Sequence, residues 1–395
     1  MPGPLDGVRI VDFTSNVAGP LATMILGDQG ADVIKIEPPD GGDPTRGSAQ
    51  RRGGYSTSFL NNNRNKRSIA IDLKAAAGRR ALLRLCESAD VFVQNYRPGV
   101  VERLGIDEPA VRAMRPDIVY VSLSGFGEVG PYAQKPVYDP IIQAYSGLAT
   151  VQAGADDLRP RMLRTILPDK LTAITAAQAI TAALLTRART GEGQHVRLSM
   201  LEAVLAFLWP SDMGDQTFVG DEPAAQEKAS ATDLVYQTSD GWITIAVQTD
   251  AQWVALAAAL ERPEWLDDAR FKTPALRQKN VEARLALTQE AVRGGSAAHW
   301  LDTLTRAGVP CAPVLTRFQV IAAPQVAALG AVVETDHPRA GRLRQMRNAA
   351  RFERTPADLR RPAPALGEQT DEILAEAGYS AAEIAGLRAD GVVAG

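Results

Sequence analysis

The sequence predicts an α/β protein with a large domain built on a parallel sheet and a smaller α+β domain. Val8–Phe13 and Asp32–Glu37 are short runs rich in β-branched residues, and a helical stretch, Leu21–Asp28, lies between them. A strand, helix and strand at this spacing predict a parallel pair with a right-handed crossover. The chain has 395 residues, which favours two domains. Ser239–Gly241 contains Asp-Gly between two apolar runs, which predicts a β-hairpin in the second domain.

Other elements follow along the chain. Asp90–Gln94, Pro116–Leu123 and Gln194–Leu198 are apolar runs that predict further strands. An apolar helix, Leu201–Trp209, follows the last of them, before a polar, turn-rich segment. Periodic apolar residues then predict two helices of the small domain, over the ranges Gln252–Leu260 and Val281–Val292.

Composition argues against several classes of protein. Lys and Arg number 43 against 46 Asp and Glu, a net charge of −3, so no basic excess favours nucleic acid or an anionic membrane surface. The first residues lack a signal-like pattern and we expect no 18-residue apolar run, so we expect a cytoplasmic protein without a membrane span. Cys86 and Cys311 lack CxxC spacing and the three histidines form no paired motif, so neither a disulfide framework nor a metal site is expected.

Asp169 stands between a short apolar segment and a helix of small residues, Ala173–Leu185. Such a helix approaches neighbouring backbone closely on more than one side, so we expect it to be buried. Spacing alone leaves two interpretations of the carboxylate open. Asp169 is either the N-cap of this helix, with Pro168 at the boundary, or a reactive group at a buried helix entrance.

Positive charge gathers ahead of and inside an alternating run that ends near Lys74. The cluster consists of Arg64, Lys66, Arg67 and Lys74. A solvated face is the usual interpretation of such a cluster. The alternative is a cradle for a polyanion, because guanidinium and ammonium groups suit phosphate oxygens.

Several ordered motifs resemble those of family III CoA-transferases, the CaiB/BaiF group that includes formyl-CoA and carnitine CoA-transferases. The matching stretches are Leu5–Thr14 with Ala18–Pro20, Pro168–Thr172, Arg189–Val196, Ser199–Ala203 and Leu366–Leu374. No single motif would suffice, but together they span nearly the whole chain. The family's Asn-Lys-Arg-Ser motif, seen here at 65–68, favours the phosphate-cradle interpretation of the basic cluster.

The resemblance implies roles for individual residues. The family's aspartate at the Asp169 position is the nucleophile, and Tyr138 or backbone N–H groups at 170–172 would stabilise oxyanions. The residues implied in CoA binding are Val17, Ala18, Leu73, Lys74, Asn95, Tyr96 and Arg103. Four residues have plainer alternatives: a turn or cap residue for Asn95, a core residue for Tyr96, a surface charge for Arg103 and a buried phenol that only packs for Tyr138. No metal or separate cofactor is implied, because the CoA thioester is itself a substrate.

The resemblance also implies an architecture. We expect a Rossmann-like large domain from 1–200 and 318–395, a connecting segment at 201–225, a small α+β domain at 226–317, and an interlocked dimer. Two departures make a formyl/oxalate substrate pair doubtful. Val17 replaces a glutamine of formyl-CoA transferase, and that enzyme's glycine-rich shielding loop is not evident between Phe218 and Thr232.

Three functions are compatible with these features. The first is transfer of CoA from an acyl-CoA to a carboxylic acid, which needs a nucleophile and oxyanion donors. The second is racemisation, as in the α-methylacyl-CoA racemases, which share the fold. Racemisation needs two proton-transfer groups. By resemblance the racemases carry a histidine base at position 138, where this chain has tyrosine, and this favours transfer. The third is a CoA-binding protein without turnover.

Overall fold

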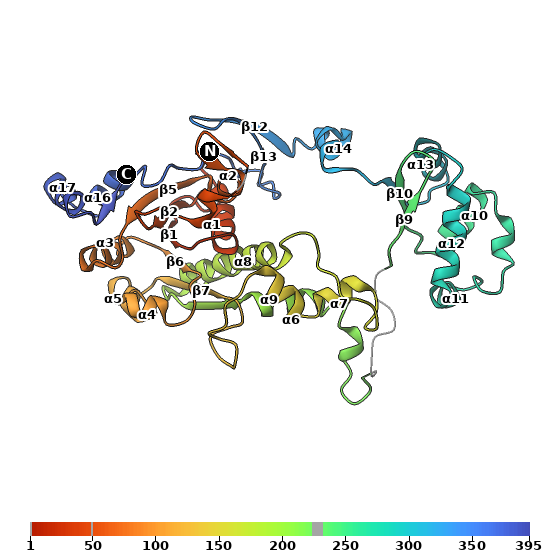
Figure 1. The fold of residues 1–395 in the computed structure, drawn as a ribbon, viewed down its shortest axis with the longest axis horizontal. Helices are drawn as coiled ribbons and strands as arrows, with labels where there is room; N and C mark the ends of the chain where they lie inside the picture. The colour runs from red at the N-terminus through yellow and green to blue at the C-terminus, as the bar shows by residue number, and fades with distance from the viewer. Residues whose placement is uncertain (1, 49, 223–231) are drawn as a thin grey trace. The chain divides into compact units, whose positions relative to one another are not determined.

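The computed structural model describes residues 2–48, 50–222 and 232–395. The chain divides into two compact units, one formed by Met1–Ser230 with Gly330–Gly395 and the other by Ala231–Leu329 (Figure 1). The expected small domain, 226–317, begins among residues that are not described. The second unit continues past 317 through α14 (Arg317–Ala322) and α15 (Pro324–Ala328).

A seven-stranded sheet forms the framework of the first unit. Its spatial order is β14-β5-β2-β1-β6-β7-β8, and every pairing is parallel except that of β14 with β5. The strands are β1 (Arg9–Phe13), β2 (Asp32–Glu37), β5 (Lys66–Ile71), β6 (Val91–Gln94), β7 (Val119–Ser124), β8 (His195–Ser199) and β14 (Val393–Ala394). The predicted α/β class with a parallel-dominated sheet is therefore confirmed. Strand order reverses between β1 and β6, because the chain proceeds outward from β1 in both directions.

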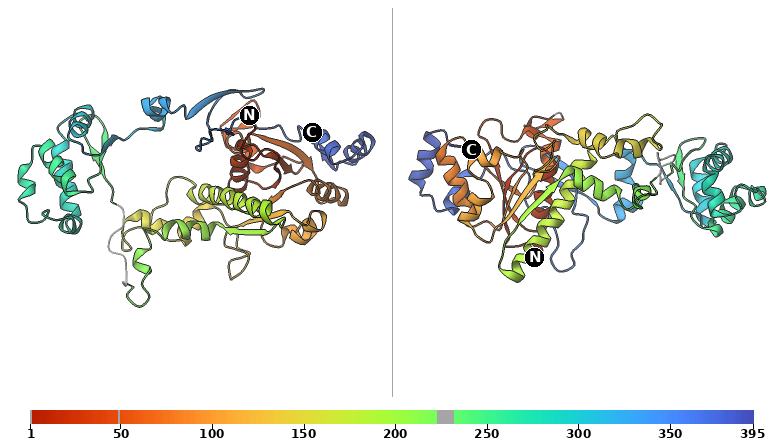
Figure 2. Two further views of the ribbon diagram at one scale, coloured as in Figure 1. Left: turned by 180° about the vertical axis from the view of Figure 1, so that it is seen from behind. Right: turned by 90° about the horizontal axis from the view of Figure 1, so that it is seen from below.

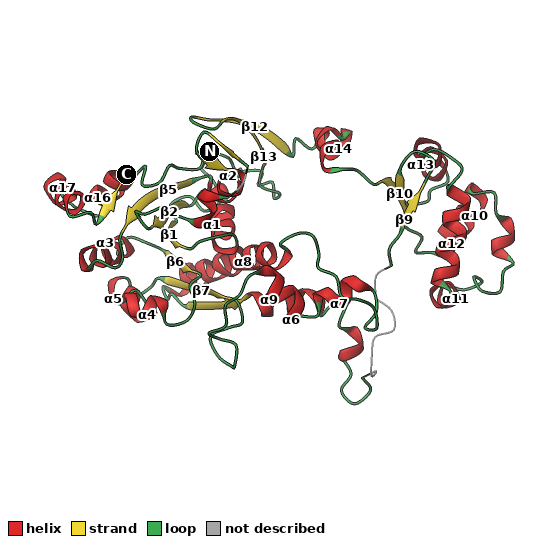
Figure 3. Cartoon of the chain, in the orientation of Figure 1, coloured by secondary structure: helices red, strands yellow, loops and turns green. Residues whose placement is uncertain are grey.

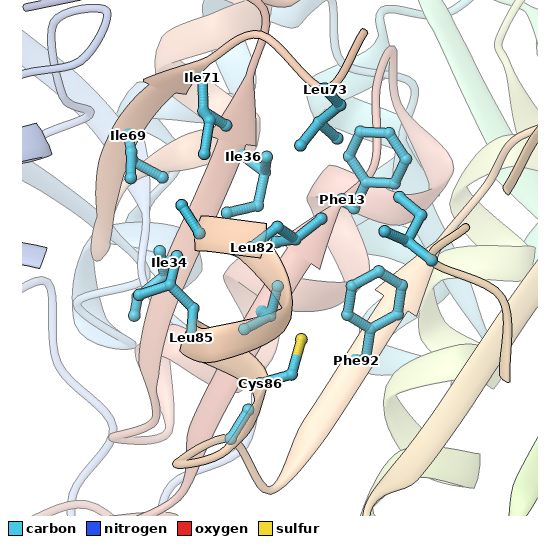
Figure 4. Packing of buried hydrophobic residues seen from close by; sticks show 14 of the residues in the cluster. Phe13, Ile34, Ile36, Ile69, Ile71, Leu73, Leu82, Leu85, Cys86 and Phe92 are labelled. Atoms are coloured by element: carbon cyan, nitrogen blue, oxygen red, sulfur yellow. The ribbon is translucent and has the colours of Figure 1, made fainter. Parts of the chain in front are cut away.

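Helices cover both faces of this sheet (Figure 3). On one face, apolar side chains of the strands pack with five helices and the C-terminal end of the chain, and Figure 4 shows Phe13, Ile36 and Leu82 in this cluster. On the other face, the strands pack with two long helices. The first set is α3 (Ala76–Cys86), α4 (Val100–Leu104), α5 (Glu108–Met114), α16 (Thr370–Glu376) and α17 (Ala381–Ala389), and the second is α1 (Ala18–Asp28) and α8 (Leu167–Thr190).

Helix α8 is buried along one stripe and not all round as expected. Its alanines at 173, 176 and 177 pack against the sheet and α1, and Figure 2 shows α8 running along the sheet. Ile174 and Leu185 on the other side are exposed. Within the described residues α8 is also the helix long and apolar enough to cross a membrane, although core helices of soluble proteins meet the same criterion. The expectation of no such segment was therefore wrong, because the Ala- and Leu-rich stretch runs on without enough charge to interrupt it.

The C-terminal segment returns to the first unit and fastens onto the start of the chain. Asn65 lies in the left-handed region, with φ of 60°, and its side chain bonds the backbone of three residues of this segment. The three are Asp358, Arg360 and Arg361. Strand β14 then pairs with β5 at the sheet edge.

Shorter elements complete the first unit. They are η1 (Pro44–Gly47), β3 (Arg51–Arg52), β4 (Tyr55–Ser56), α2 (Thr57–Asn63), α6 (Asp139–Tyr145), α7 (Leu148–Ala153), α9 (Met200–Leu208), η2 (Gly214–Gln216), β12 (Val332–His337) and β13 (Gly341–Met346). Helix α9 occupies the start of the expected connecting segment at 201–225 and packs against α8 and α6.

The second unit is a three-stranded antiparallel sheet with helices on one face. The predicted hairpin is confirmed, because β9 (Val235–Gln237) pairs with β10 (Trp242–Ile245) across the Asp-Gly turn. The other elements are α10 (Asp250–Ala259), η3 (Pro263–Leu266), α11 (Pro274–Lys279), α12 (Val281–Val292), α13 (Ala297–Arg306) and β11 (Cys311–Pro313). Its core contains Trp253, Trp265 and Phe271.

Candidate active site

The loops that follow the parallel strands meet at one edge of the sheet. At the β1/β6 reversal they enclose a pocket of about 240 Å³. A crevice at this kind of reversal is where open α/β sheets place ligands. Six of the residues implied by the family resemblance line it: Val17, Ala18, Asn95, Tyr96, Tyr138 and Asp169. The structure thus brings together residues that are up to 152 positions apart (169 − 17).

Asp169 does not cap its own helix. The N-cap of α8 is Ile166, and Asp169 is the third residue of the first turn. Its carboxylate instead lies beside the backbone N–H of Ala18, the first residue of α1, which favours the ionised form. The N-cap interpretation is therefore wrong. The carboxylate lies at the N-terminus of another helix, where free N–H groups and the helix dipole favour negative charge.

The surroundings of Asp169 make its carboxylate unusually basic. Burial, followed by the nearby carboxylate of Asp139, raises the pKa of Asp169 to about 6, and the Ala18 N–H opposes this rise. No cation contributes to the shift. The group is therefore mostly ionised at neutral pH while more basic than an ordinary carboxylate, which suits a nucleophile.

Sequence reasoning missed Asp139. This buried residue begins α6, and its Oδ2 accepts the backbone N–H of Asp169 at 3.3 Å. Gln143, one turn later, donates from Nε2 to Asp139 Oδ1 at 2.6 Å. The same amide bonds the backbone of Leu163 and Thr165, which lead into α8. Asp139-Pro at a helix start with Gln at i+4 was the available signal, since these two side chains share one face.

Asn95 and Tyr96 join the two loops at the strand reversal. The Asn95 amide accepts from Ser15 N at 2.9 Å and donates to Ser15 O at 2.8 Å, so it clamps the β1–α1 turn. Tyr96 stacks on Phe13 with ring centroids 4.4 Å apart while still lining the pocket. Both residues therefore have the structural role of the plainer alternative as well as a place in the pocket: Asn95 holds a turn and Tyr96 packs against the core.

The groups expected to stabilise oxyanions are Tyr138 and the backbone N–H groups at 170–172, and the structure places them differently relative to the pocket. Tyr138 is 71% exposed and borders the pocket, so it is not a packed core phenol. The N–H of Lys170, one of the expected oxyanion donors, already bonds Ile166 O. The N–H that faces Asp169 belongs to Ala18. Lys135, which the sequence reasoning did not select, also lines the pocket, with Nζ 4.3 Å from the Tyr132 ring centroid.

Three of the implied CoA contacts lie outside this pocket. Leu73 is buried in the hydrophobic cluster near Phe13 (Figure 4). Lys74 is exposed after β5, at the same sheet edge. Arg103 is exposed on α4. Their roles in binding CoA stay predictions.

The basic cluster at 64–67 is neither a solvated face nor a phosphate cradle. Lys66 is fully buried and pairs with Asp12 at 2.8 Å. Arg64 pairs with Asp28 at 2.7 Å, and Arg67 bonds Asp32 at 2.6 Å. Sequence could not reveal this, because the acidic partners come from α1 and the strands β1 and β2, far along the chain.

Metal chemistry has no candidate ligand set in the described ranges. No group of three or more His, Cys, Asp or Glu side chains there is placed to hold an ion. Cys86 is buried, which raises the pKa of its thiol, and both Cys86 and Cys311 are free.

Comparisons with known proteins agree with the motifs. The model of CoA-transferase family III matches residues 5–370. The chain is 34% identical over 380 residues to succinyl-CoA:glutarate CoA-transferase of Homo sapiens, covering 94% of this chain and 86% of that protein. It is 37% identical over 336 residues to acetyl-CoA:oxalate CoA-transferase of Acetobacter aceti, covering 84% and 86%. A CAIB/BAIF family protein from Brucella suis superposes with a TM-score of 0.83 at 32% identity, covering 95% of this chain and all of that one.

Proposed function

This chain belongs to CoA-transferase family III, and from that premise we propose that it moves CoA from an acyl-CoA thioester to a free carboxylic acid through a covalent intermediate on Asp169. The observation that carries the proposal is the environment of this carboxylate. It lines a pocket at the strand reversal, faces the N-terminus of α1, and has a raised pKa without a neutralising cation.

The proposed first half of the reaction releases the donor acid. A carboxylate oxygen of Asp169 attacks the thioester carbonyl, a C–O bond forms, and the C–S bond breaks to give a mixed anhydride and CoA thiolate. The thiolate then attacks the aspartyl carbonyl and expels the donor carboxylate. The product is a β-aspartyl-CoA thioester. Holding these groups in line contributes about 7–11 kcal/mol toward the barrier in well-oriented systems.

The second half repeats these steps in reverse order on the acceptor. The acceptor carboxylate attacks the aspartyl thioester carbonyl and expels CoA thiolate, and the thiolate then attacks the acceptor's acyl carbonyl. This regenerates Asp169 and releases the new acyl-CoA. One carboxylate is consumed and one is formed, so no proton is taken up. Each addition develops negative charge on a carbonyl oxygen, and the first turn of α1 with the Tyr138 hydroxyl would stabilise it.

Trapping tests the intermediate directly. Incubating the protein with acyl-CoA and then hydroxylamine should convert Asp169 to a hydroxamate, detected by mass spectrometry of its peptide. Asp169→Asn keeps the shape of the side chain and removes the nucleophile, so CoA binding should survive while transfer falls at least about 10³-fold. Transfer by this variant at near wild-type rate would exclude Asp169 as the nucleophile.

The acids are to be identified by a screen. Acetyl-CoA and succinyl-CoA as donors, with a panel of mono- and dicarboxylic acids, should yield new CoA esters in the mass spectrum. A separate incubation of the protein with a 2-methylacyl-CoA in deuterium oxide tests racemisation, because a racemase exchanges the α-proton of this substrate with solvent. CoA binding without either reaction would favour a protein without turnover.

We further propose that the chain forms an interlocked homodimer and works in the cytoplasm without a cofactor beyond its CoA substrate. Exposed apolar side chains support an additional interface, since Ile174 of α8, Phe207 of α9 and the adjacent Trp209 are each about half exposed. A threaded dimer would not dissociate on dilution without unfolding. Light scattering that finds a folded monomer at low concentration would contradict it.

A further inference from the structure

Six charged side chains lie together beneath the turn that joins β1 to α1. They come from three adjacent strands and the loop after β2, and all but Arg46 are buried. The cations are Lys35, Arg46 and Lys66, and the anions are Asp12, Glu37 and Asp43. Replacing such groups with apolar residues of similar volume is often neutral or stabilising, because removing charges from water costs free energy. Stability alone therefore does not account for the cluster.

The two lysines of this cluster hold the backbone of the turn at both ends. Lys35 Nζ donates to Thr14 O at 3.0 Å and pairs with Asp43 at 2.9 Å. Lys66 Nζ donates to Pro20 O at 2.8 Å and pairs with Asp12 at 2.8 Å. Asp12 in turn accepts from Thr14 N at 3.1 Å. Residues 14 and 20 are thus fixed by ammonium groups that no solvent reaches.

The turn between these two points is conformationally unusual. Asn16 has φ of 66°, a left-handed conformation that costs free energy for a residue other than glycine. Gly19 packs so closely on Thr14 that a Cβ there would lie 2.4 Å from the Thr14 side chain. Ala18, whose N–H lies beside the carboxylate of Asp169, directly follows this turn as the first residue of α1.

We propose that Lys35 and Lys66 are positioning residues for the transfer reaction: by tethering Thr14 O and Pro20 O, they hold the Ala18 N–H against the carboxylate of Asp169. The inference rests on the proposed role of Asp169 as nucleophile. It explains why buried charge stands beneath the turn that leads into the Ala18 N–H. Asn95 assists from the loop that follows β6 by holding Ser15.

Lys66 also makes the tether sensitive to pH. Burial lowers the pKa of Lys66 to about 8. The carboxylates of Asp12 and Asp43 oppose this fall, and the ammonium of Lys35 adds to it. The hydrogen-bond partners that α2 and α1 give the ammonium are neutral: the Asn63 side chain at 2.9 Å and the Pro20 carbonyl at 2.8 Å. Deprotonation of Lys66 as pH rises through 8 should therefore loosen the turn at Pro20.

The test compares Lys66→Met with Arg64→Met. Arg64 is a matched control because it is similarly buried, pairs with Asp28 as Lys66 pairs with Asp12, and has no bond to the 14–20 turn. Both variants leave one carboxylate unpaired and should lose similar stability. Only Lys66→Met should lower kcat, by about 10²-fold, with little change in KM. It should also move the acidic limb of adduct formation on Asp169 upward by about one pH unit. The Ala18 N–H favours the ionised carboxylate, so a turn that no longer holds this N–H in place lets the pKa of Asp169 rise.

Two further measurements decide the matter if Lys66→Met does not fold. The double variant Asp12→Asn, Lys66→Met leaves no unpaired charge, and should fold with the same loss of kcat and the same shift of the limb. In the wild-type protein, hydrogen exchange of the 14–20 peptide, corrected for intrinsic rates, should accelerate between pH 7 and 9.5. An unshifted limb in a folded Lys66 variant, an equal shift in Arg64→Met, or unchanged protection across that range overturns the proposal. Absence of any adduct in the wild-type protein would instead refute the proposed function.

Discussion

Two carboxylates near the same edge of the sheet have opposite properties. Asp12 is wholly buried, and burial alone would raise its pKa, yet the ammonium groups of Lys66 and Lys35 hold that pKa below its usual value. Asp169 is only half-buried, yet burial followed by the neighbouring carboxylate of Asp139 raises its pKa to about 6, with no cation among the causes. The charged partners of a carboxylate therefore decide whether its charge stabilises the fold or remains available for chemistry.

The largest expected effect is on stability at position 12. Asp12→Asn keeps the hydrogen-bonding shape but leaves Lys66 buried without its counter-ion, and should cost about 3–5 kcal/mol in the free energy of unfolding at pH 7. Urea denaturation followed by circular dichroism measures it. A loss below about 1 kcal/mol would show that the charge of Asp12 does not stabilise the fold, and the contrast with Asp169 would then fail.

The same change from Asp to Asn should have the opposite effect on the free energy of unfolding at position 169. The ionised carboxylate of Asp169 destabilises the fold at neutral pH, because its folded pKa of about 6 exceeds its unfolded value. Asp169→Asn should therefore stabilise the protein by on the order of 1–2 kcal/mol at pH 7. This gain should shrink as pH falls through 6, where the wild-type carboxylate takes up a proton. Thermal unfolding at pH 5 and pH 7.5 gives the comparison, and a destabilised variant at both values contradicts it.

Asp139→Asn should make Asp169 more like an ordinary carboxylate. Removing the neighbouring negative charge lowers the pKa of Asp169, so the acidic limb of the pH–rate profile should move to lower pH. The amide oxygen can still accept the Asp169 N–H, so kcat at the optimum should change by less than about tenfold. A limb that stays in place would assign the raised pKa to burial alone.

The smallest effect is expected where charge is exposed. Arg103→Ala should weaken CoA binding by about 1 kcal/mol or less, because solvent screens an ion pair at this exposed position on α4. Isothermal calorimetry with CoA measures the difference. Arg84→Ala is a suitable control, since Arg84 belongs to α3 and bonds Gly378 O. Equal affinities for wild type and both variants would remove Arg103 from the site.

Much of the fold was predictable because it depends on local pattern. Apolar runs at 32–37 and 90–94 predicted strands at nearly their observed bounds, and the Asp-Gly turn located the hairpin of the second unit. The fate of each charge was not predictable in this way. Lys66 and Lys74 look alike in sequence, yet one is buried and the other exposed, since only the folded sheet brings Asp12 beside Lys66.

The site shows the same division. Asp169, Asn95 and Tyr96 were identified through ordered motifs, and they do line one pocket. Spacing could not decide between an N-cap and a reactive group for Asp169, because its partner, Ala18, is 151 residues away along the chain (169 − 18). Asp139 was overlooked because an acidic residue in the first turn of a helix has an ordinary explanation in the helix dipole.

The pairing of β14 with β5 has a consequence for biosynthesis. Val393 and Ala394 close an edge of the sheet whose partner residues, Ile71 and Ala70, leave the ribosome more than 300 residues earlier. Until residue 394 is made, the backbone of β5 offers unpaired N–H and C=O groups to any extended chain nearby. Contacts of such long sequence separation also form slowly. Nascent chains of this protein should therefore depend on chaperones that shield strand edges, and truncation before Val393 should promote aggregation during synthesis more than it lowers the activity of the molecules that fold.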